Sequence, residues 1–151
     1  MTPRRPTIKD VPALAQIVND WIDATLWMPR DLPPEGIADL ISKGLPQREM
    51  WMIGEPARAY ISIEAEIAHI WGFYSAEPGQ GFGKLLMDRA KEGRDFLSLN
   101  THVPNVGAQK FYVREGFVPT GEIEQGPVST VAGTPDRKPT GLRELRMEWR
   151  R

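Results

Sequence analysis

Three glycines at alternate positions, Gly79, Gly81 and Gly83, constrain this chain more than any other feature of its sequence. The run before them, residues 66–74, reads EIAHIWGFY and is typical of a β-strand, whereas the residues after them place apolar side chains at helical spacing. Glycine allows backbone conformations that other residues avoid, and the first N–H groups of a helix have no partner inside the helix. A strand, a glycine loop and a helix in this order therefore form either a plain turn or a phosphate-binding site.

The spacing of the glycines excludes two familiar nucleotide loops. A P-loop needs G-x-x-x-x-G-K followed by Ser or Thr, but Gly79 and Gly83 are one residue too close and Leu85 follows Lys84. A dinucleotide-binding loop needs G-x-G-x-x-G, which alternating glycines do not provide. A turn and a phosphate loop of another kind remain as alternatives at this point.

The rest of the chain alternates helical and strand patterns, with no internal repeat. Two amphipathic helices are expected first, over residues 11–23 and in a second segment that ends at Gly44, with Ile37, Leu40 and Ile41 facing inward. The helix after the glycines is expected to bury Phe82, Leu85, Leu86 and Ala90. The remaining predicted elements are strands at EMWMIG, RAYISIE, EIAHIWGFY, FLSLNT and FVPTGE, a helix at NVGAQKFYVREG, and a closing strand from Leu145.

Length and composition indicate one soluble α/β or α+β domain over residues 1–151, in which the Gly- and Pro-rich residues 121–142 form a long mobile loop. The net charge of −1 argues against a general nucleic-acid binder. The chain has no cysteine, which excludes disulfides and thiolate chemistry. Neither a signal peptide nor a membrane span is recognisable, so we expect a cytoplasmic protein that does not bind membranes.

A second motif, NVGAQKFYVREGF over residues 105–117, brings three side chains together. At 100° per residue, Asn105, Ala108 and Tyr112 lie on about one face of a helix. The small alanine between two polar residues leaves room for a ligand, and Tyr112 places a phenol at the end of the row. The alternative is that Asn105 caps the helix while Ala108 and Tyr112 pack in the core.

Together, the strand that enters GQGFGKLL and the later NxxAxxFYxxxGF pattern resemble the GNAT acetyltransferase superfamily. The order of predicted elements matches along essentially the whole chain, although the specific residues lie within 73–117. The resemblance implies a single GNAT-like domain with a mixed, mostly antiparallel central sheet, splayed strands and flanking helices. It implies an acetyl-CoA-dependent N-acetyltransferase that uses no metal.

The resemblance also assigns roles to individual residues. In this family the glycine loop holds the pyrophosphate of acetyl-CoA through backbone N–H groups, and the strand before it binds the pantetheine arm by its main chain. Tyr112 matches the tyrosine that protonates the leaving CoA thiolate, and Asn105 lies near the pantetheine beside Ala108. The remaining implied cofactor-binding residues are Phe73, Tyr74, Ser75, Gly79, Gln80, Gly81, Phe82, Gly83 and Lys84.

The loop departs from the family pattern at one position. Pro78 stands where the family usually has Gln or Arg before the first loop glycine, and the loop is about two residues short. Proline has no N–H, so one phosphate contact is lost. Gln80 is a candidate to replace the missing polar side chain. The backbone N–H groups from Gly79 to Lys84 are expected to make most of the hydrogen bonds to the pyrophosphate.

Acetyl transfer to a protonated amine also needs a base. Glu64, Glu66 and His69 lie at or near the predicted hairpin, and His69 shares strand parity with Trp71 and Phe73, so Glu66 and His69 are selected as catalytic candidates beside Tyr112. His102 is interpreted as a loop residue. No His, Asp or Glu cluster has metal-ligand spacing.

The acceptor site of this family lies by the first two helices and the last strands. Here that places Trp27 and Met28, with the loop over 121–142, at a pocket for a small-molecule amine, and Arg30 near enough to meet a carboxylate or simply solvated. A non-catalytic module that binds CoA or a partner, and an acetyltransferase of peptide or protein amines, are the alternatives. Assembly as a homodimer is left open.

Overall fold

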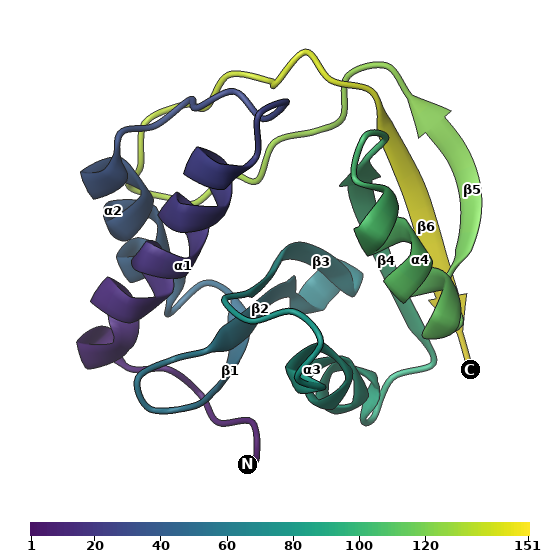
Figure 1. Ribbon diagram of the computed structural model, residues 1–151, viewed down its shortest axis with the longest axis horizontal. Helices are drawn as coiled ribbons and strands as arrows, with labels where there is room; N and C mark the ends of the chain where they lie inside the picture. The colour runs from purple at the N-terminus through teal and green to yellow at the C-terminus, as the bar shows by residue number, and fades with distance from the viewer.

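A computed structural model describes residues 1–151 and contains four α-helices around a six-stranded sheet (Figure 1). The predicted order of elements is confirmed, with two helices first, three strands, a helix, a strand, a helix and two last strands. No helix combines the length and the apolar composition that crossing a bilayer requires. The elements are α1 (Val11–Ala24), α2 (Pro34–Gly44), β1 (Glu49–Ile53), β2 (Ala59–Glu64), β3 (His69–Ser75), α3 (Phe82–Lys91), β4 (Phe96–His102), α4 (Val106–Arg114), β5 (Val118–Ile123) and β6 (Glu144–Arg150), with short 3-10 turns at Ile8–Asp10 and Ala65–Ile67.

The sheet has the order β1-β2-β3-β4-β6-β5, and every neighbouring pair is antiparallel except β3 and β4. The parallel pair is also the shortest, because only His69 with Ser98 and Ile70 with Leu99 are in register. Beyond these two pairs the strands separate. The mixed sheet with splayed strands that the sequence predicts is confirmed.

A bulge in β3 changes which side chains share a face. Ser62 pairs with Gly72 but Ile63 pairs with Ile70, so Trp71 is the additional residue on β3. A bulge of this kind shifts the alternation of side chains by one position. As a result Ile70 and Phe73 pack on the same side of the sheet, and the strand parity expected for His69 and Phe73 is broken.

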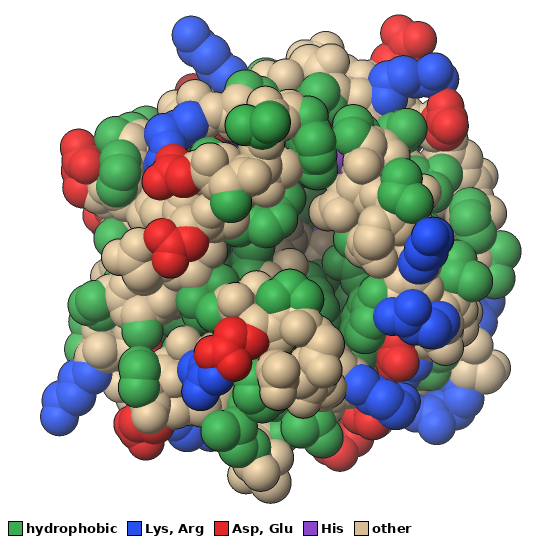
Figure 2. Space-filling view, in the orientation of Figure 1, with side chains coloured by type: hydrophobic (Ala, Val, Ile, Leu, Met, Phe, Trp, Pro, Cys, Tyr) green, Lys and Arg blue, Asp and Glu red, His purple; other side chains and the backbone are tan.

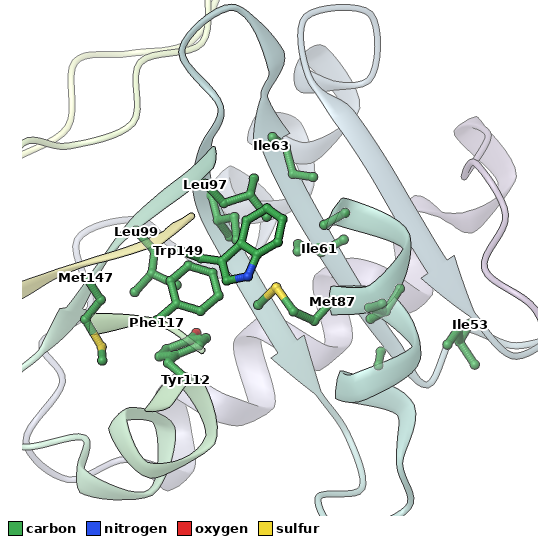
Figure 3. Close-up of a cluster of buried hydrophobic side chains, with 14 residues drawn as sticks. Ile53, Ile61, Ile63, Met87, Leu97, Leu99, Tyr112, Phe117, Met147 and Trp149 are labelled. Atoms are coloured by element: carbon green, nitrogen blue, oxygen red, sulfur yellow. The ribbon is translucent and has the colours of Figure 1, made fainter. Parts of the chain in front are cut away.

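Two apolar clusters cover the two faces of the sheet. On one face, Leu86, Met87 and Ala90 from α3 and Tyr112 from α4 pack against sheet residues such as Ile61 (Figure 3). On the other face, α1 and α2 pack against Met52 and Tyr60. The expectation for α3 needs one correction, since Leu85 is 40% exposed and Met87 is fully buried in its place.

The long connection between β5 and β6 crosses over to α2. It begins after Ile123 and ends before Glu144, a little later at each end than the predicted loop over 121–142, because β5 and β6 extend to those residues. Val131 is buried, Lys43 Nζ donates to the Gly133 carbonyl at 2.7 Å, and Arg48 Nη2 donates to the Thr130 carbonyl at 2.7 Å. The mobility of the long connection stays a prediction. Movement of the segment away from α2 would break these two hydrogen bonds.

Candidate active site

A cleft of about 680 Å³ lies where β3 and β4 separate. Its walls are β3, the loop over 77–84, the end of β4 and α4, and Figure 2 shows the hollow in the middle of this face of the molecule. We call it the interstrand cleft. It is built from both glycine-containing motifs of the sequence, which are far apart in the chain and meet only because the parallel strands diverge.

The glycine loop presents backbone rather than side chains to this cleft. Gly79 and Gly81 have φ of 87° and 81°, a left-handed conformation that favours glycine, and a Cβ at either would meet nothing within 4 Å. Gly81 is the N-cap of α3 and supplies no side-chain cap, so the first N–H groups of the helix stay unsatisfied by side chains. Such N–H groups, at the positive end of the helix dipole, favour an anion.

Gly83 is needed for packing. A Cβ there would lie 3.3 Å from Phe111 Cζ and 3.4 Å from Phe73 Cε1, so α3 approaches β3 and α4 as closely as it does because the side chain is absent. Gln80 does not line the cleft, whereas Pro78 and Lys84 do. Gln80 is therefore not placed where it could replace the polar residue that Pro78 displaces, which is the role that the sequence suggested for it.

The second half of β3 has one free edge. Phe73, Tyr74 and Ser75 pair with β2 on one side and have no strand partner on the other, where the interstrand cleft begins. Unpaired main-chain N–H and C=O groups at such an edge can bind an extended ligand as a further strand would. All three predicted residues of this segment line the cleft.

The predicted face of α4 also lines the cleft. Asn105, Ala108 and Tyr112 all border it. Asn105 caps the helix as well, because its Oδ1 accepts from the Ala108 N–H at 3.3 Å, so capping and lining occur together. Burial raises the pKa of the Tyr112 phenol, which is 8% exposed, so the hydroxyl is protonated at neutral pH and can donate a proton or a hydrogen bond.

The two predicted bases do not lie in the cleft. Glu66 is exposed in the short turn between β2 and β3, at the end of the hairpin away from the loop. His69 is buried where β3 and β4 are still paired, and its Nδ1 lies 2.7 Å from Ser98 Oγ. Burial lowers the pKa of His69 to about 4. Strand parity placed His69 on the same face as Phe73, and this was wrong because the bulge at Trp71 shifts the alternation of side chains between the two residues.

His102 is the histidine that borders the cleft, and the sequence interpretation missed it. It is the last residue of β4 rather than a loop residue, and its Nε2 lies 3.9 Å from Glu144 Oε2 on β6. Burial lowers the pKa of His102, so the imidazole is neutral at neutral pH and can accept a proton. Burial raises the pKa of Glu144. The pairing of β4 with β6, which joins His102 to Glu144, was the missing signal.

A second, smaller cavity of about 90 Å³ adjoins the cleft on the side of α1 and α2. We call it the helix-side cavity. It shares Trp21, Trp71, Gly72 and Tyr74 with the interstrand cleft, so these residues form the border between the two spaces. Its remaining lining comes from α1, α2, the strands β1 and β2, Met28, Asp31, Arg48 and the long connection.

The two predicted acceptor residues lie near these spaces in different ways. Met28 lines the helix-side cavity. Trp27 lines neither space, but its ring packs against two others. Its ring centroid lies 5.8 Å from that of Trp21 and 5.6 Å from that of His102. Arg30 is held by Asn19 Oδ1 at 2.8 Å and Asp23 Oδ1 at 2.9 Å, which leaves it outside the cavity. The structure contains no group of three or more His, Asp or Glu side chains arranged to hold a metal ion.

Solved structures with the same fold are numerous. A ribosomal-protein-alanine N-acetyltransferase from Brucella melitensis aligns over 100% of both chains with a TM-score of 0.69 and 22% identity. An acetyltransferase from Salmonella typhimurium, solved with its cofactor acetyl-CoA, aligns over 99% of this chain and 93% of its own with a TM-score of 0.66 and 20% identity. An acetyltransferase of the GNAT family from Desulfovibrio desulfuricans aligns over 99% of this chain and 98% of its own with a TM-score of 0.69 and 13% identity.

At this level of identity the likeness concerns the fold. The chain has the GNAT acetyltransferase fold, as its two sequence motifs implied. No family model matches the sequence, and no curated protein sequence does either.

Proposed function

We propose that this protein is an acetyl-CoA-dependent N-acetyltransferase that acetylates the primary amine of a small molecule. One observation carries the proposal: β3 and β4 separate after two residue pairs, and the opening has the glycine loop at one wall and Tyr112 at another. A cleft through a sheet lets a donor and an acceptor meet from opposite faces. Several neighbours with this fold are named acetyltransferases, and the Salmonella typhimurium protein described above was solved with acetyl-CoA.

The donor would lie along the wall that offers main-chain groups. The pyrophosphate of CoA fits the N–H groups from Gly79 to Lys84, with the positive charge of Lys84 beside them. The pantetheine arm fits the free edge of Phe73–Ser75, where its amides can replace the missing strand. The other side of the arm would rest against Asn105 and Ala108, because alanine leaves room at the α4 face.

The chemistry needs a base and an acid on the two sides of the thioester. In our proposal the amine nitrogen forms a bond to the thioester carbonyl carbon, the carbon–sulfur bond breaks, and the sulfur leaves with its electron pair. The amine reacts in its neutral form, and the His102 imidazole takes the one proton that its nitrogen loses as the amide forms. The Glu144 carboxylate, 3.9 Å from His102 Nε2, would stabilise the imidazolium. The Tyr112 hydroxyl gives its proton to the thiolate and later recovers one from water.

The size of the acceptor space favours a small molecule. The helix-side cavity has a volume of only about 90 Å³, and the long connection lines it through Ser129, Val131 and Arg137. An extended peptide would need an open groove. Trp27 contributes indirectly in this proposal, because it supports the Trp21 and His102 rings at the border.

The test is turnover. Purified protein is mixed with acetyl-CoA and a panel of small primary amines, and release of the free CoA thiol is followed together with the mass of the acetylated product. We expect turnover with at least one amine and none without amine. Tight acetyl-CoA binding with no product from any amine or peptide would favour a non-catalytic CoA-binding module, and absence of binding would overturn the proposal.

A further inference from the structure

The helix-side cavity combines an apolar body with three charged side chains. Most of its lining is apolar and includes Val18, Ile22, Ile37 and Ile41. The charged residues are Asp31, Arg48 and Arg137, two positive charges against one negative. Burying a charge in apolar surroundings costs free energy unless the charge has a hydrogen-bonded or oppositely charged partner. The partners of these three side chains therefore show whether one of them could still bind a charged ligand.

Asp31 and Arg137 satisfy each other. Arg137 Nε donates to Asp31 Oδ2 at 2.9 Å, and Arg137 Nη2 donates to Asp31 Oδ1 at 3.1 Å. This two-bond arrangement is the strongest geometry that an arginine and a carboxylate can adopt. The side chains are only 21% and 15% exposed, so the pair fixes the long connection beside the cavity and contributes little net charge.

Arg48 is different, because its positive charge has no carboxylate hydrogen-bonded to it. Its side chain is 8% exposed, and its buried Nε–H has no hydrogen-bond acceptor. Its Nη2 donates to the Thr130 carbonyl at 2.7 Å and lies 3.4 Å from Ser129 Oγ. The nearest carboxylate, that of Glu64, is 3.9 Å away and accepts from Trp71 Nε1 at 2.9 Å.

We propose, on the basis of the proposed function, that the acceptor amine carries a carboxylate and that Arg48 binds this carboxylate in the helix-side cavity. A carboxylate in the cavity would give the Arg48 guanidinium a hydrogen-bonded anionic partner, which Glu64 at 3.9 Å does not provide. The hydroxyls of Tyr60 and Tyr74, which also line the cavity, are further donors for the same group. The substrate class is therefore a small amino acid or a short amino-carboxylic acid.

The position of the cavity fits this orientation of the acceptor. Trp21, Trp71, Gly72 and Tyr74 belong to both spaces, so a short molecule with its carboxylate in the helix-side cavity extends its amine toward the interstrand cleft. The volume of about 90 Å³ suits a carboxylate with few additional atoms. A bulky acceptor would have to displace the long connection.

The experiment compares amines that differ only in the carboxylate. The matched pairs are alanine and ethylamine, valine and isobutylamine, leucine and isoamylamine, and γ-aminobutyrate and propylamine. We expect kcat/KM to be higher for the acid in at least one pair by about 10- to 100-fold, as a hydrogen-bonded charge pair would provide. Arg48→Gln should remove that preference by raising KM for the acid, and Arg48→Lys should restore part of it.

The matched control is Lys43→Gln. Lys43 also tethers the long connection, through the Gly133 carbonyl, but does not line the cavity. If Arg48 acted only by anchoring that segment, both variants would slow the acid and the amine alike. Equal loss for the two members of a pair in Arg48→Gln, or no preference in the native protein, would overturn the inference and leave the acetyltransferase proposal intact.

A binding measurement decides the matter if no member of the pairs is turned over. N-Acetylleucine and N-acetylisoamylamine are titrated by calorimetry into the native protein and into Arg48→Gln, each in the presence of CoA. The inference predicts tighter binding of the acid by the native protein and equal, weak binding of both by the variant. Equal binding by the native protein would contradict it, whereas failure of CoA itself to bind would contradict the proposed function.

Discussion

The interstrand cleft and the helix-side cavity are built on opposite principles. The cleft depends on backbone features, which are the left-handed glycines, the N–H groups at the start of α3 and the free edge of β3. The cavity is shaped by side chains from segments far apart, such as Trp21, Arg48 and Arg137. The difference teaches that the proposed donor half can be recognised from a short motif, whereas the proposed acceptor half depends on contacts between segments far apart in the chain.

The largest expected effect lies in the backbone half. Gly83→Glu adds a Cβ 3.3 Å from Phe111 and places a carboxylate where the pyrophosphate should bind. We expect acetyl-CoA affinity to fall by about 10³-fold or more, measured by calorimetry. Gly121→Glu is the matched control, because a Cβ at Gly121 meets nothing within 4 Å. Equal affinities of Gly83→Glu and the native protein would remove the glycine loop from the donor site.

The next effect is expected at the candidate base in the interstrand cleft. His102→Gln removes the proposed base, and general-base catalysis contributes about 10²- to 10⁴-fold, so kcat should fall by a factor in that range. Because burial lowers the pKa of His102, native kcat/KM, expressed per concentration of unprotonated amine, should rise with pH through a pKa below the ordinary value of about 6.5 and then level off. The variant should lose this rise.

The other histidine provides the control for that pH profile. His69 is buried beside Ser98 and borders neither space, so His69→Gln should change stability and leave the profile in place. An unchanged profile in His102→Gln, or a lost one in His69→Gln, would reassign the base.

A smaller loss is expected at the acid. Tyr112→Phe removes only the hydroxyl and keeps the ring that packs against Phe73, Phe111 and Phe117. We expect kcat to fall by about 10²-fold while the Kd for acetyl-CoA changes little. Single-turnover kinetics separates the two quantities. Native turnover in this variant would exclude Tyr112 from the chemistry.

The smallest effect is expected in the side-chain half. Trp27→Ala removes the ring that supports Trp21 and His102, and each such aromatic contact contributes about 0.5–1.5 kcal/mol. The KM for the acceptor should rise by about 3- to 10-fold with acetyl-CoA affinity preserved. Weaker acetyl-CoA binding with an unchanged acceptor KM would place Trp27 on the donor side instead.

The same contrast explains how much of the molecule could be predicted from the sequence. Period-two strands and helical spacing gave the element order, and the two motifs gave Asn105, Ala108 and Tyr112 as one face of α4 that lines the cleft. These features are local, because a helix or a strand repeats its own pattern along the chain. Local patterns could therefore predict the elements and their order, whereas the mixed sheet with splayed strands came from the resemblance to the GNAT superfamily.

The candidate base and the carboxylate subsite could not be predicted, for a physical reason in each case. His102 meets Glu144 only through the pairing of β4 with β6, across 42 positions of sequence. His69 was misassigned because the bulge at Trp71 changed its face, and strand parity cannot reveal a bulge. Arg48 belongs to no sequence motif. It is a candidate only because the folded chain buries its Nε–H without a hydrogen-bond acceptor.

The central claim is that the opening between β3 and β4 holds acetyl-CoA, and amide NMR tests it most directly. CoA is titrated into isotope-labelled protein and the backbone N–H signals are followed. The account predicts the largest shifts at the amides of 79–84, 73–75 and 105–108, with β1 at Glu49–Ile53 nearly unchanged. Binding of CoA that leaves the amides of 79–84 unmoved, or that shifts β1 instead, would contradict the account.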